Sequence, residues 1–333
     1  MKKSPVRALA ALVATTALAL AGCSTGTPTA TPAASASGSA AAKTYKIGIT
    51  QIVAHPSLDA SREGFKKAIT DAGLKATFDE KNAQGDQATA TSIANTFNAG
   101  GYDLVLAIAT PTAQASAQVI TQTPILFTAV TDPVAAQLVK SNEAPGANVT
   151  GTTDMNPVAD QVKLVKTVKP DAKSVGIIYS SGEVNSEVQV AAAREAAAAE
   201  GLTLVERSVT TSADVQQAAS GLDVDAFYIP TDNTVVSGLD AVIQVAETKK
   251  IPIIAGEGDS VANGALVTYG IDYSKLGYQT GEMAVKILTQ GADPATMPVE
   301  TQEELTLVVN SAAAGRMGIT LPADLLADAT DVG

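Results

Sequence analysis

The feature that most constrains the fold of this chain is an internal repeat at a distance of 128 residues. In each half a glycine lies in a short apolar run, a second glycine ends the helical stretch that follows, and a proline opens a later apolar run. The matching pairs are Gly48 and Gly176, Gly73 and Gly201, and Pro124 and Pro252. A glycine followed by a leucine is a common way to end a helix and re-enter a sheet. The repeat predicts two similar lobes.

Between these positions, short apolar runs rich in β-branched residues alternate with helical stretches. Near-continuous apolar runs are typical of parallel strands that are covered on both faces. The predicted strands are 45–50, 103–108, 124–128, 174–179, 225–229, 252–255 and 305–309. The predicted helices are 57–72, 185–200, 233–249 and 273–290. This alternation predicts an α/β fold with two Rossmann-like, doubly wound lobes joined by hinge strands.

Two short extended segments, 148–151 and 265–270, occupy matching places at the end of each half. We expect the chain to pass between the lobes there. The predicted lobe 1 comprises residues 44–151 and 269–300, and the predicted lobe 2 comprises residues 152–268 and 301–326. Two lobes joined by several hinge strands can close on a bound molecule.

The N-terminus has the pattern of an export signal. Residues 1–22 combine a basic start with an apolar run that is shorter than the ~20 residues a membrane-spanning helix needs. The sequence Leu20-Ala21-Gly22-Cys23 resembles a bacterial lipobox, which predicts cleavage before Cys23 and lipidation of its sulfur. An ordinary secretory signal is the alternative. Residues 23–43 are small, polar and proline-punctuated, and we expect a flexible tether there. The prediction is an extracytoplasmic protein, lipid-anchored to the cell membrane.

Composition excludes several classes of function. Lys and Arg number 22 against 34 Asp and Glu, and the resulting charge of -12 repels nucleic acid. One cysteine and one histidine, His55, cannot build a zinc cluster. No phosphate-binding glycine loop follows a predicted strand. Glu257 and Asp259 form an acidic pair, but a glycine-flanked loop is a poor holder for a hydrolase site. We therefore expect no enzyme activity, no cofactor and no metal.

Ligands of open parallel sheets bind beyond the carboxyl ends of the strands. The loops at those ends contain hydroxyls, amides and carboxylates but no Arg, Lys or Trp, and the crossing segments add Asp154 and Asp272. This set suits a zwitterion such as an amino acid. We expect Asp232 and Glu257 to bind its ammonium group, and Thr110 and Thr112 with nearby N–H groups to bind its carboxylate. The candidate site residues are Gln51, Thr110, Thr112, Thr131, Asp132, Tyr179, Asn185, Ser186, Asp232, Asn233, Glu257 and Asp272.

Each candidate has a simpler alternative role. Thr110, Ser186 and Asn233 stand at predicted helix starts, where such residues cap the helix. Asp132 precedes a proline and is a common turn residue. Tyr179 and Tyr228 either line the cleft or are half-buried strand residues. His55, which precedes a proline, is a loop residue that need not contact a ligand.

The loops also resemble a known family. The matching motifs are ITQIV (49–53), HP (55–56), LD (58–59), TDPV (131–134), NVTGT (148–152), SGEVNS (181–186), YIPTDN (228–233), GEGD (256–259), YGIDY (269–273) and LG (276–277). Over about residues 45–320 the chain resembles the ABC-transporter substrate-binding lipoproteins for tryptophan or tyrosine. The resemblance implies a class I periplasmic-binding-protein fold. By position it implies a ligand role for Gln51, Thr112, Thr131, Asp132, Asn185, Ser186, Asp232, Glu257 and Asp272.

The expected function is therefore capture of a small zwitterionic ligand by lobe closure and its delivery to the transmembrane subunits of an ABC permease. We expect a monomer whose partners are the ligand, the permease and, through the lipid anchor, the membrane. One alternative is a sensor that delivers the ligand to a receptor. Another is a binder of a small molecule other than an amino acid.

Overall fold

The computed structural model describes residues 43–302 and 304–333. These residues form one compact unit. The predicted signal peptide, Cys23 and the tether up to residue 42 lie outside the described residues. In the described part, no helix combines the length and the apolar character needed to cross a membrane.

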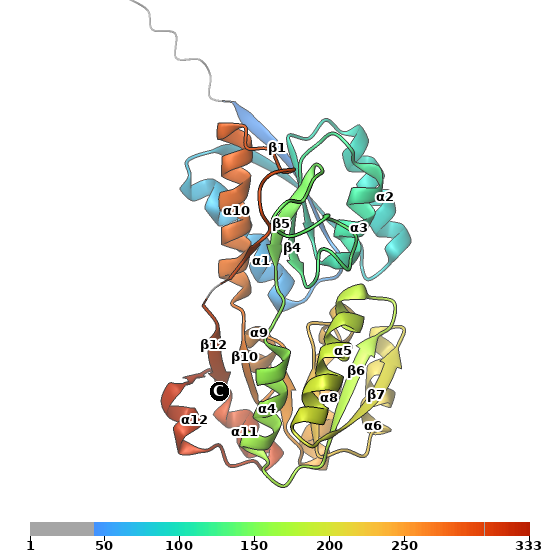
Figure 1. Ribbon diagram of the computed structural model, residues 1–333, viewed down its shortest axis with the longest axis vertical. Coiled ribbons are helices and arrows are strands. Elements are labelled where there is room, and N and C mark those ends of the chain that lie inside the picture. Colours follow the sequence, from blue (N-terminus) through green and yellow to red (C-terminus); the bar gives the residue numbers. More distant parts are fainter. Residues whose placement is uncertain (1–42, 303) are drawn as a thin grey trace, which may run out of the picture. The chain divides into compact units, whose positions relative to one another are not determined.

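The first sheet has six parallel strands, in the order β11-β5-β4-β3-β1-β2 (Figure 1). Its strands are β1 (Thr44–Gln51), β2 (Lys75–Asn82), β3 (Leu104–Ile108), β4 (Ile125–Val130), β5 (Val149–Thr153) and β11 (Glu300–Thr301). The sheet and the helices packed on it are called lobe 1 below.

The second sheet has seven strands, in the order β13-β12-β10-β9-β8-β6-β7. Its strands are β6 (Ser174–Ser180), β7 (Thr203–Val209), β8 (Ala226–Ile229), β9 (Ile253–Ala255), β10 (Val267–Gly270), β12 (Thr306–Val309) and β13 (Thr330–Asp331). Only the pairing of β10 with β12 is antiparallel among the described strands. From β5 to β2 and from β10 to β7 the strand order is the same in the two sheets, which confirms two similar α/β lobes. The second sheet and its helices are called lobe 2.

Helices connect the strands in both lobes. Those that follow strands of lobe 1, or pack on it, are α1 (Pro56–Asp71), α2 (Gln87–Ala99), α3 (Thr110–Val119) and α10 (Tyr273–Gln290). Those of lobe 2 are α4 (Val158–Val168), α5 (Val184–Ala199), α6 (Val215–Ser220), α7 (Asn233–Val236), α8 (Leu239–Lys249), α9 (Gly258–Ala262), α11 (Ser311–Met317) and α12 (Ala323–Asp328), with a 3-10 turn at Ser212–Asp214. The single helix predicted over 233–249 is wrong. It breaks into α7 and α8 at Gly238, because glycine is a poor helix former.

The repeated glycines have matching physical causes in the two lobes. A Cβ on Gly48 would lie 3.0 Å from the ring of Phe97, and a Cβ on Gly176 would lie 3.0 Å from Val224. Gly73 and Gly201 have φ values of 71° and 65°. Only glycine adopts that left-handed region without a steric cost, so both halves use it to leave a helix.

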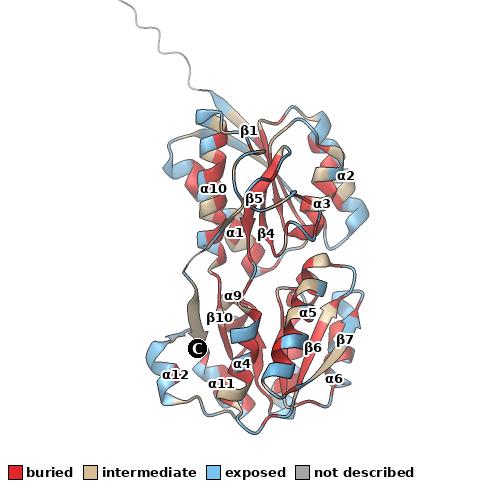
Figure 2. Ribbon diagram, in the orientation of Figure 1, coloured by how far each residue is buried: buried red, intermediate tan, exposed pale blue. Residues whose placement is uncertain are grey.

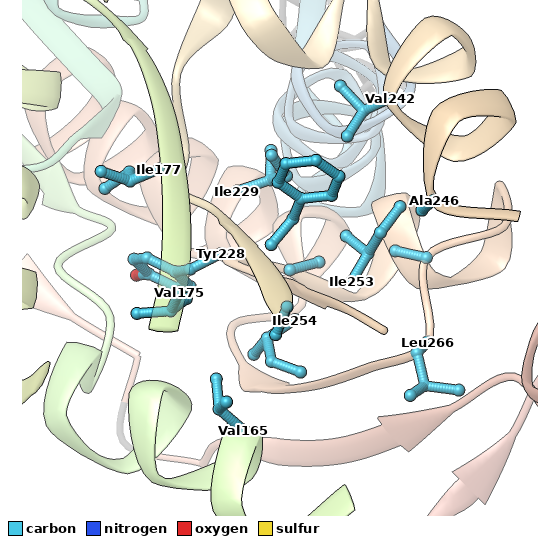
Figure 3. Packing of buried hydrophobic residues seen from close by; sticks show 14 of the residues in the cluster. Val165, Val175, Ile177, Tyr228, Ile229, Val242, Ala246, Ile253, Ile254 and Leu266 are labelled. Atoms are coloured by element: carbon cyan, nitrogen blue, oxygen red, sulfur yellow. The ribbon is translucent and has the colours of Figure 1, made fainter. Parts of the chain in front are cut away.

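The core of each lobe is a sheet covered on both faces. The inner strands β3, β4 and β8 are buried along their whole length, and Figure 2 shows this for β4 in red. Successive strand residues point to opposite faces. Figure 3 shows Ile253 beside Ala246 of α8 and Ile254 on the side of Val165 of α4. Tyr228 is fully buried in this core and its hydroxyl donates to Gln161 at 2.8 Å, so it is a core residue and not a cleft residue.

The lobes are joined where the chain leaves β5, β10 and β11. The predicted boundaries at 151/152, 268/269 and 300/301 each fall inside one of these strands. β5 and β10 each extend two residues beyond the predicted boundary, and the third boundary divides the two residues of β11. Lobe 2 also extends past residue 326, because β13 pairs with β12. As predicted, the helix after β10 returns to lobe 1, where α10 packs along α1.

The contact between α1 and α10 is made by glycines. A Cβ on Gly277 would lie 1.9 Å from the backbone oxygen of Ser61, and one on Gly64 would lie 2.2 Å from that of Ser274. A Cβ on Gly281 would lie 2.5 Å from the Cβ of Ala68. The two helices therefore touch backbone to backbone. This contact fixes the start of α10 against the start of α1, and both starts contribute to the site described next.

Candidate ligand-binding site

A narrow pocket lies between the two lobes. We call it the inner cavity. Lobe 1 supplies His55, Ser57, Leu58 and Ala129. The crossing segments supply Asp154 and Tyr273, and lobe 2 supplies Asn185, Thr231, Asp232, Asn233, Val236 and Glu257.

The topology explains why these residues meet. Glu257 follows β9, Asp232 follows β8 and Asn185 opens the helix after β6, all at the carboxyl end of the second sheet. Ser57 opens the helix after β1 in the first sheet. Parallel strands place their carboxyl ends at one edge of a sheet, and ligands bind beyond that edge. The inner cavity lies where the two edges face each other.

Asp154 is a buried carboxylate in the first crossing segment. Its Oδ1 accepts a hydrogen bond from the Thr131 hydroxyl at 3.0 Å, and its Oδ2 accepts one from the Tyr273 hydroxyl. Burial raises the pKa of Asp154, against the opposing effect of these two hydrogen bonds. Asp154 thus ties lobe 1 to the start of α10 at one wall of the cavity.

Asp232 is fully buried at the start of α7. Its Oδ1 accepts from the Val235 N–H at 2.8 Å and caps that helix. Its Oδ2 accepts from the Ser180 N–H and the Ser186 hydroxyl, both at 2.6 Å. Burial, with the charge of nearby Glu183, raises the pKa of Asp232 to about 7. Its position is therefore fixed by three hydrogen bonds from neutral donors.

Glu257 is the third carboxylate of the inner cavity. It caps α9 by accepting from the Ser260 N–H at 3.0 Å, and it also accepts from the Ser260 hydroxyl. Burial, with the charge of Asp259, raises the pKa of Glu257 to about 7.

The electrostatic character of the inner cavity follows from these groups. Three carboxylates line it, and none of its described lining residues is a lysine or an arginine. A buried carboxylate without a cation is costly, which is why the pKa values of all three rise. A ligand that carries an ammonium group would supply the missing charge.

Other polar atoms of the inner cavity lack partners. Within the described residues, both ring nitrogens of His55, the hydroxyl of Ser57 and the Oδ1 of Asn185 are buried without a hydrogen bond. Ser57 and Leu58 also lie in the first turn of α1, where backbone N–H groups have no partner within the helix. These donors and the positive end of the helix dipole suit a carboxylate. The cavity therefore offers acceptors for a cation and donors for an anion.

Four of the predicted site residues line the inner cavity: Asn185, Asp232, Asn233 and Glu257. Two more support it from behind, because Thr131 donates to Asp154 and Ser186 donates to Asp232. Asp232 is itself the N-cap of α7, and Asn233 follows it as the first helical residue. The Asp232 side chain thus both caps α7 and lines the inner cavity.

Other predicted residues are engaged elsewhere. The amide of Gln51 donates to the Val53 oxygen at 2.8 Å and to Asp59 at 2.9 Å, and it accepts from Arg62. Asp132 accepts from two backbone N–H groups of the turn that follows it. Asp272 caps α10 by accepting from the Ser274 N–H at 2.9 Å. None of the three lines the inner cavity.

The predicted carboxylate-binding threonines also lie outside the inner cavity. The hydroxyl of Thr112 donates to the Ile108 oxygen at 2.6 Å, inside lobe 1. Thr110 is buried at the start of α3, and Ala109, not Thr110, is the residue that precedes this helix. Tyr179 is half-buried beside the charges of Glu187 and Glu206, and it does not line the inner cavity.

Sequence reasoning missed Ser57 and Tyr273 and gave His55 no role. Ser57 follows His55-Pro56 in the loop after a predicted strand, and the proline at the start of the helix is a signal that could have marked Ser57. Tyr273 is the first residue of a helix and gave no such signal. Asp154 was expected only as a polar residue of a crossing segment. No group of three or more metal-ligating side chains gathers in residues 43–302 and 304–333.

Comparison with known proteins identifies the class. The model of the ABC transporter substrate binding protein family matches residues 46–333. Solute-binding proteins that are only 13% and 16% identical match this chain with TM-scores of 0.61 and 0.60, and show that the fold is that of the periplasmic binding proteins. The chain belongs to the ABC transporter substrate-binding family, as the sequence motifs predicted. It is an extracytoplasmic binding protein and not an enzyme.

Other relatives have a much higher sequence identity to this chain. A tyrosine-binding protein of Clostridioides difficile is 46% identical over 274 residues, which cover 80% of this chain and 79% of the relative. An ABC domain from Streptococcus pneumoniae, solved in complex with L-Trp, is 37% identical. The match covers 87% of this chain and 99% of that domain, with a TM-score of 0.83. The ligand-free, open structure of a substrate-binding protein with adhesive properties from Clostridium difficile is 46% identical. The match covers 86% of this chain and 99% of that protein's chain, with a TM-score of 0.66.

Proposed function

We propose that this protein captures an aromatic amino acid of the tyrosine or tryptophan kind in the inner cavity and delivers it to an ABC permease for import. The observation that carries the proposal is the pocket between the lobes whose three carboxylates meet no lysine or arginine among its lining residues. The donors at the start of α1 face the same space. An α-amino acid carries both complementary charges on one carbon atom.

Two observations support an aromatic side chain on the ligand: the apolar residues that line the inner cavity and the ligands of the relatives. Leu58, Val236 and the ring of Tyr273 give the inner cavity an apolar part. Ligand pockets of this kind are mostly apolar with a few placed polar groups. The relatives that match over most of this chain are a tyrosine-binding protein and a domain bound to L-Trp.

Capture by lobe closure is supported by a contrast between two relatives. The chain resembles the L-Trp-bound structure more closely than the ligand-free, open one, although the open relative has the higher sequence identity. A closed arrangement also agrees with the burial of Asp232 and Glu257. Because the ligand contacts both lobes, it binds the closed form more tightly than the open form and shifts the population toward closure.

Attachment to the membrane is the last part of the proposal. The lipobox-like sequence ending in Cys23 favours a lipid anchor, and residues 24–42 would tether the folded part to it. An anchored capture protein stays near the permease that it serves.

Titration calorimetry with a ligand panel tests the proposal. L-tyrosine and L-tryptophan should bind, whereas tyramine, which lacks the carboxylate, and 3-(4-hydroxyphenyl)propionate, which lacks the ammonium, should each bind about 100-fold more weakly. Loss of one charge-assisted contact in a buried site costs about 2–5 kcal/mol. Tight binding of a neutral sugar, or equal binding of the propionate and L-tyrosine, would contradict the proposed ligand class.

The affinity should rise with pH. Burial raises the pKa values of Asp232 and Glu257 to about 7, so both carboxyls bind protons below that pH. A ligand ammonium requires the charged form, and protons therefore compete with it. We expect a gain of about tenfold or more between pH 6 and pH 8 and a plateau above pH 8.

The titration of His55 also makes the ligand affinity rise with pH. Burial lowers the pKa of His55 to about 4, and on exposure its pKa returns toward the ordinary value of 6.5. Protonation below pH 6.5 thus favours the open form. Calorimetry from pH 5.5 to pH 8.5 measures the profile, with Glu257→Gln as the comparison variant, whose profile should be flatter. An affinity that falls as the pH rises would rule out ammonium capture by these carboxylates.

A further inference from the structure

Glu183 is a buried carboxylate that lies directly behind the ligand site. It stands at the N-cap position of α5, but its side chain makes no capping hydrogen bond there. Instead its Oε1 accepts from the N–H and the hydroxyl of Thr234, at 3.1 Å and 2.8 Å. Its Oε2 accepts from the side-chain amides of Asn185 and Asn233 and from the N–H of Asn233. Five hydrogen bonds thus converge on a residue that is only 7% exposed.

The contact with Glu183 fixes which way the amide of Asn185 is turned. The Nδ2 of Asn185 lies 3.1 Å from the Glu183 Oε2 and 3.2 Å from the backbone oxygen of Thr231. A rotated amide would place its own oxygen against these two oxygens, so the hydrogen-bond network selects one orientation. The other end of the amide, Oδ1, is therefore turned away from Glu183. Within the described residues Oδ1 is buried without a hydrogen-bond partner.

This unpartnered oxygen belongs to the acidic part of the site. Asn185 lines the inner cavity together with Asp232 and Glu257. Its Nδ2 lies 3.4 Å from the hydroxyl of Ser186, which donates to Asp232 at 2.6 Å. An ammonium group has three N–H donors and so needs three acceptors. The Asn185 oxygen can be one of them beside the carboxylates, and a donor from the ligand would remove the cost of leaving this oxygen buried and unpaired.

We propose that Glu183 is a positioning residue of the ligand site: its carboxylate turns the Asn185 amide so that Oδ1 accepts a hydrogen bond from the ligand's ammonium group. This inference rests on the proposed function. Glu183 does not line the inner cavity, so it acts through its neighbours. Without the Glu183 carboxylate, the Asn185 amide loses one of the two acceptors that hold it. A rotated amide would present its NH₂ group, which repels an ammonium.

The measurement compares two ligands that differ only in the ammonium group. We define the ammonium preference as the affinity for L-tyrosine divided by the affinity for 3-(4-hydroxyphenyl)propionate, both from titration calorimetry at pH 8. Glu183→Ala should lower this preference about tenfold, because L-tyrosine binds more weakly while the propionate does not. Asn185→Ala should lower it by a similar factor. Hydrogen bonds to charged groups are strong enough for a change of this size.

A double variant separates positioning from a direct effect of charge. The pKa of Asp232 is raised by burial and also by the charge of Glu183, so the charge of Glu183 is felt in the inner cavity. If Glu183 acts through Asn185, then Glu183→Ala changes the ammonium preference less than twofold in the Asn185→Ala background. A tenfold change in both backgrounds would show that Glu183 acts by its charge alone, and would overturn the inference.

The controls separate positioning from a purely structural role. Glu187→Ala removes the same charge one turn further along α5, where the side chain is exposed and does not line the inner cavity, and it should keep the wild-type preference. Thermal unfolding of each variant checks the fold. If Glu183→Ala weakens both ligands by the same factor, its role is structural and the inference is overturned. Should Glu183→Ala fail to fold, Asn185→Ala decides, because an unchanged preference in that variant overturns the inference equally.

Failure of the inference is distinguishable from failure of the proposed function. If the wild type prefers L-tyrosine strongly and the preference persists in Glu183→Ala and Asn185→Ala, capture of an amino acid stands and the role of Glu183 falls. If the wild type binds the propionate as tightly as L-tyrosine, the proposed ligand class falls, and the inference falls with it.

Discussion

Glu257→Gln should weaken binding of an aromatic amino acid by roughly 100-fold while leaving the fold intact. The substitution removes a charge from the inner cavity but keeps an oxygen that can accept from the Ser260 N–H and cap α9. Taking away one partner of a buried charge pair costs about 2–5 kcal/mol, and about 1.4 kcal/mol corresponds to a factor of ten. Titration calorimetry at pH 8, where the wild-type carboxylate is charged, measures the loss.

Asp259→Asn is the matched control for that variant. Asp259 stands two residues away and does not line the inner cavity. Its substitution changes the net charge by the same amount, so a long-range effect of charge would appear equally in both variants. We expect less than a threefold change for Asp259→Asn. Equal losses in the two variants, or an unchanged affinity in Glu257→Gln, would remove Glu257 from the ammonium site.

Asp232→Asn should also weaken binding, but it is a less direct test. The Asp232 carboxylate holds the Ser180 N–H, the Ser186 hydroxyl and the first turn of α7 together. Its substitution therefore disturbs lobe 2 as well as the ligand site. The same reasoning applies to Asp154, which holds Thr131 and Tyr273. In this cavity the carboxylates that would hold a ligand are also the groups that hold the walls.

In the proposed capture by lobe closure, the division of donors and acceptors between the lobes would supply the driving force. Lobe 1 brings the unpartnered hydroxyl of Ser57 and the first turn of α1. Lobe 2 brings Asp232 and Glu257. Neither lobe alone presents both charges that an amino acid needs. Under the proposed function, only the closed arrangement would satisfy both charges of the ligand, so binding energy would hold the lobes together.

The fold could be predicted from the sequence because its determinants are local and repeated. The predicted helix over 273–290 has the observed bounds, and the predicted strand over 174–179 differs by one residue from β6. Gly73 and Gly201 mark the same helix exit in both lobes because both need a left-handed backbone. The break between α7 and α8 was missed, since an apolar period continues across Gly238.

The site could be predicted only in part, because a loop sequence does not say which way a side chain turns. Asp232 and Asp272 both follow a strand and precede a helix, and both cap that helix. Only Asp232 also faces the inner cavity. Thr112 turns back to the Ile108 oxygen, a choice set by the helix geometry of α3 and not by residue type. Pairings between distant segments, such as Asp154 with Tyr273, lie beyond any local pattern.

Gly277→Ala should destabilise the protein and weaken ligand binding at a distance. A Cβ at this position would lie 1.9 Å from the Ser61 oxygen and 2.6 Å from the Ser61 Cα, both backbone atoms of α1. Because neither helix can yield by turning a side chain, α1 and α10 must move apart. Overpacking of this kind costs about 1–3 kcal/mol or more, against a gain of about 0.5–1 kcal/mol for alanine over glycine in a helix. We expect a net loss of about 2 kcal/mol and a fall of roughly 4–8 °C in the unfolding midpoint.

The effect on binding follows from where the two helices begin. α1 starts beside His55, Ser57 and Leu58, and α10 starts at Tyr273, so separating the helices displaces two walls of the inner cavity. Gly315→Ala is the matched control, because Gly315 lies in α11 and a Cβ there would meet nothing within 4 Å. That control should keep or raise the unfolding midpoint and keep the affinity. If Gly277→Ala behaves like Gly315→Ala in thermal unfolding and calorimetry, the backbone contact between α1 and α10 does not hold this side of the cavity in place.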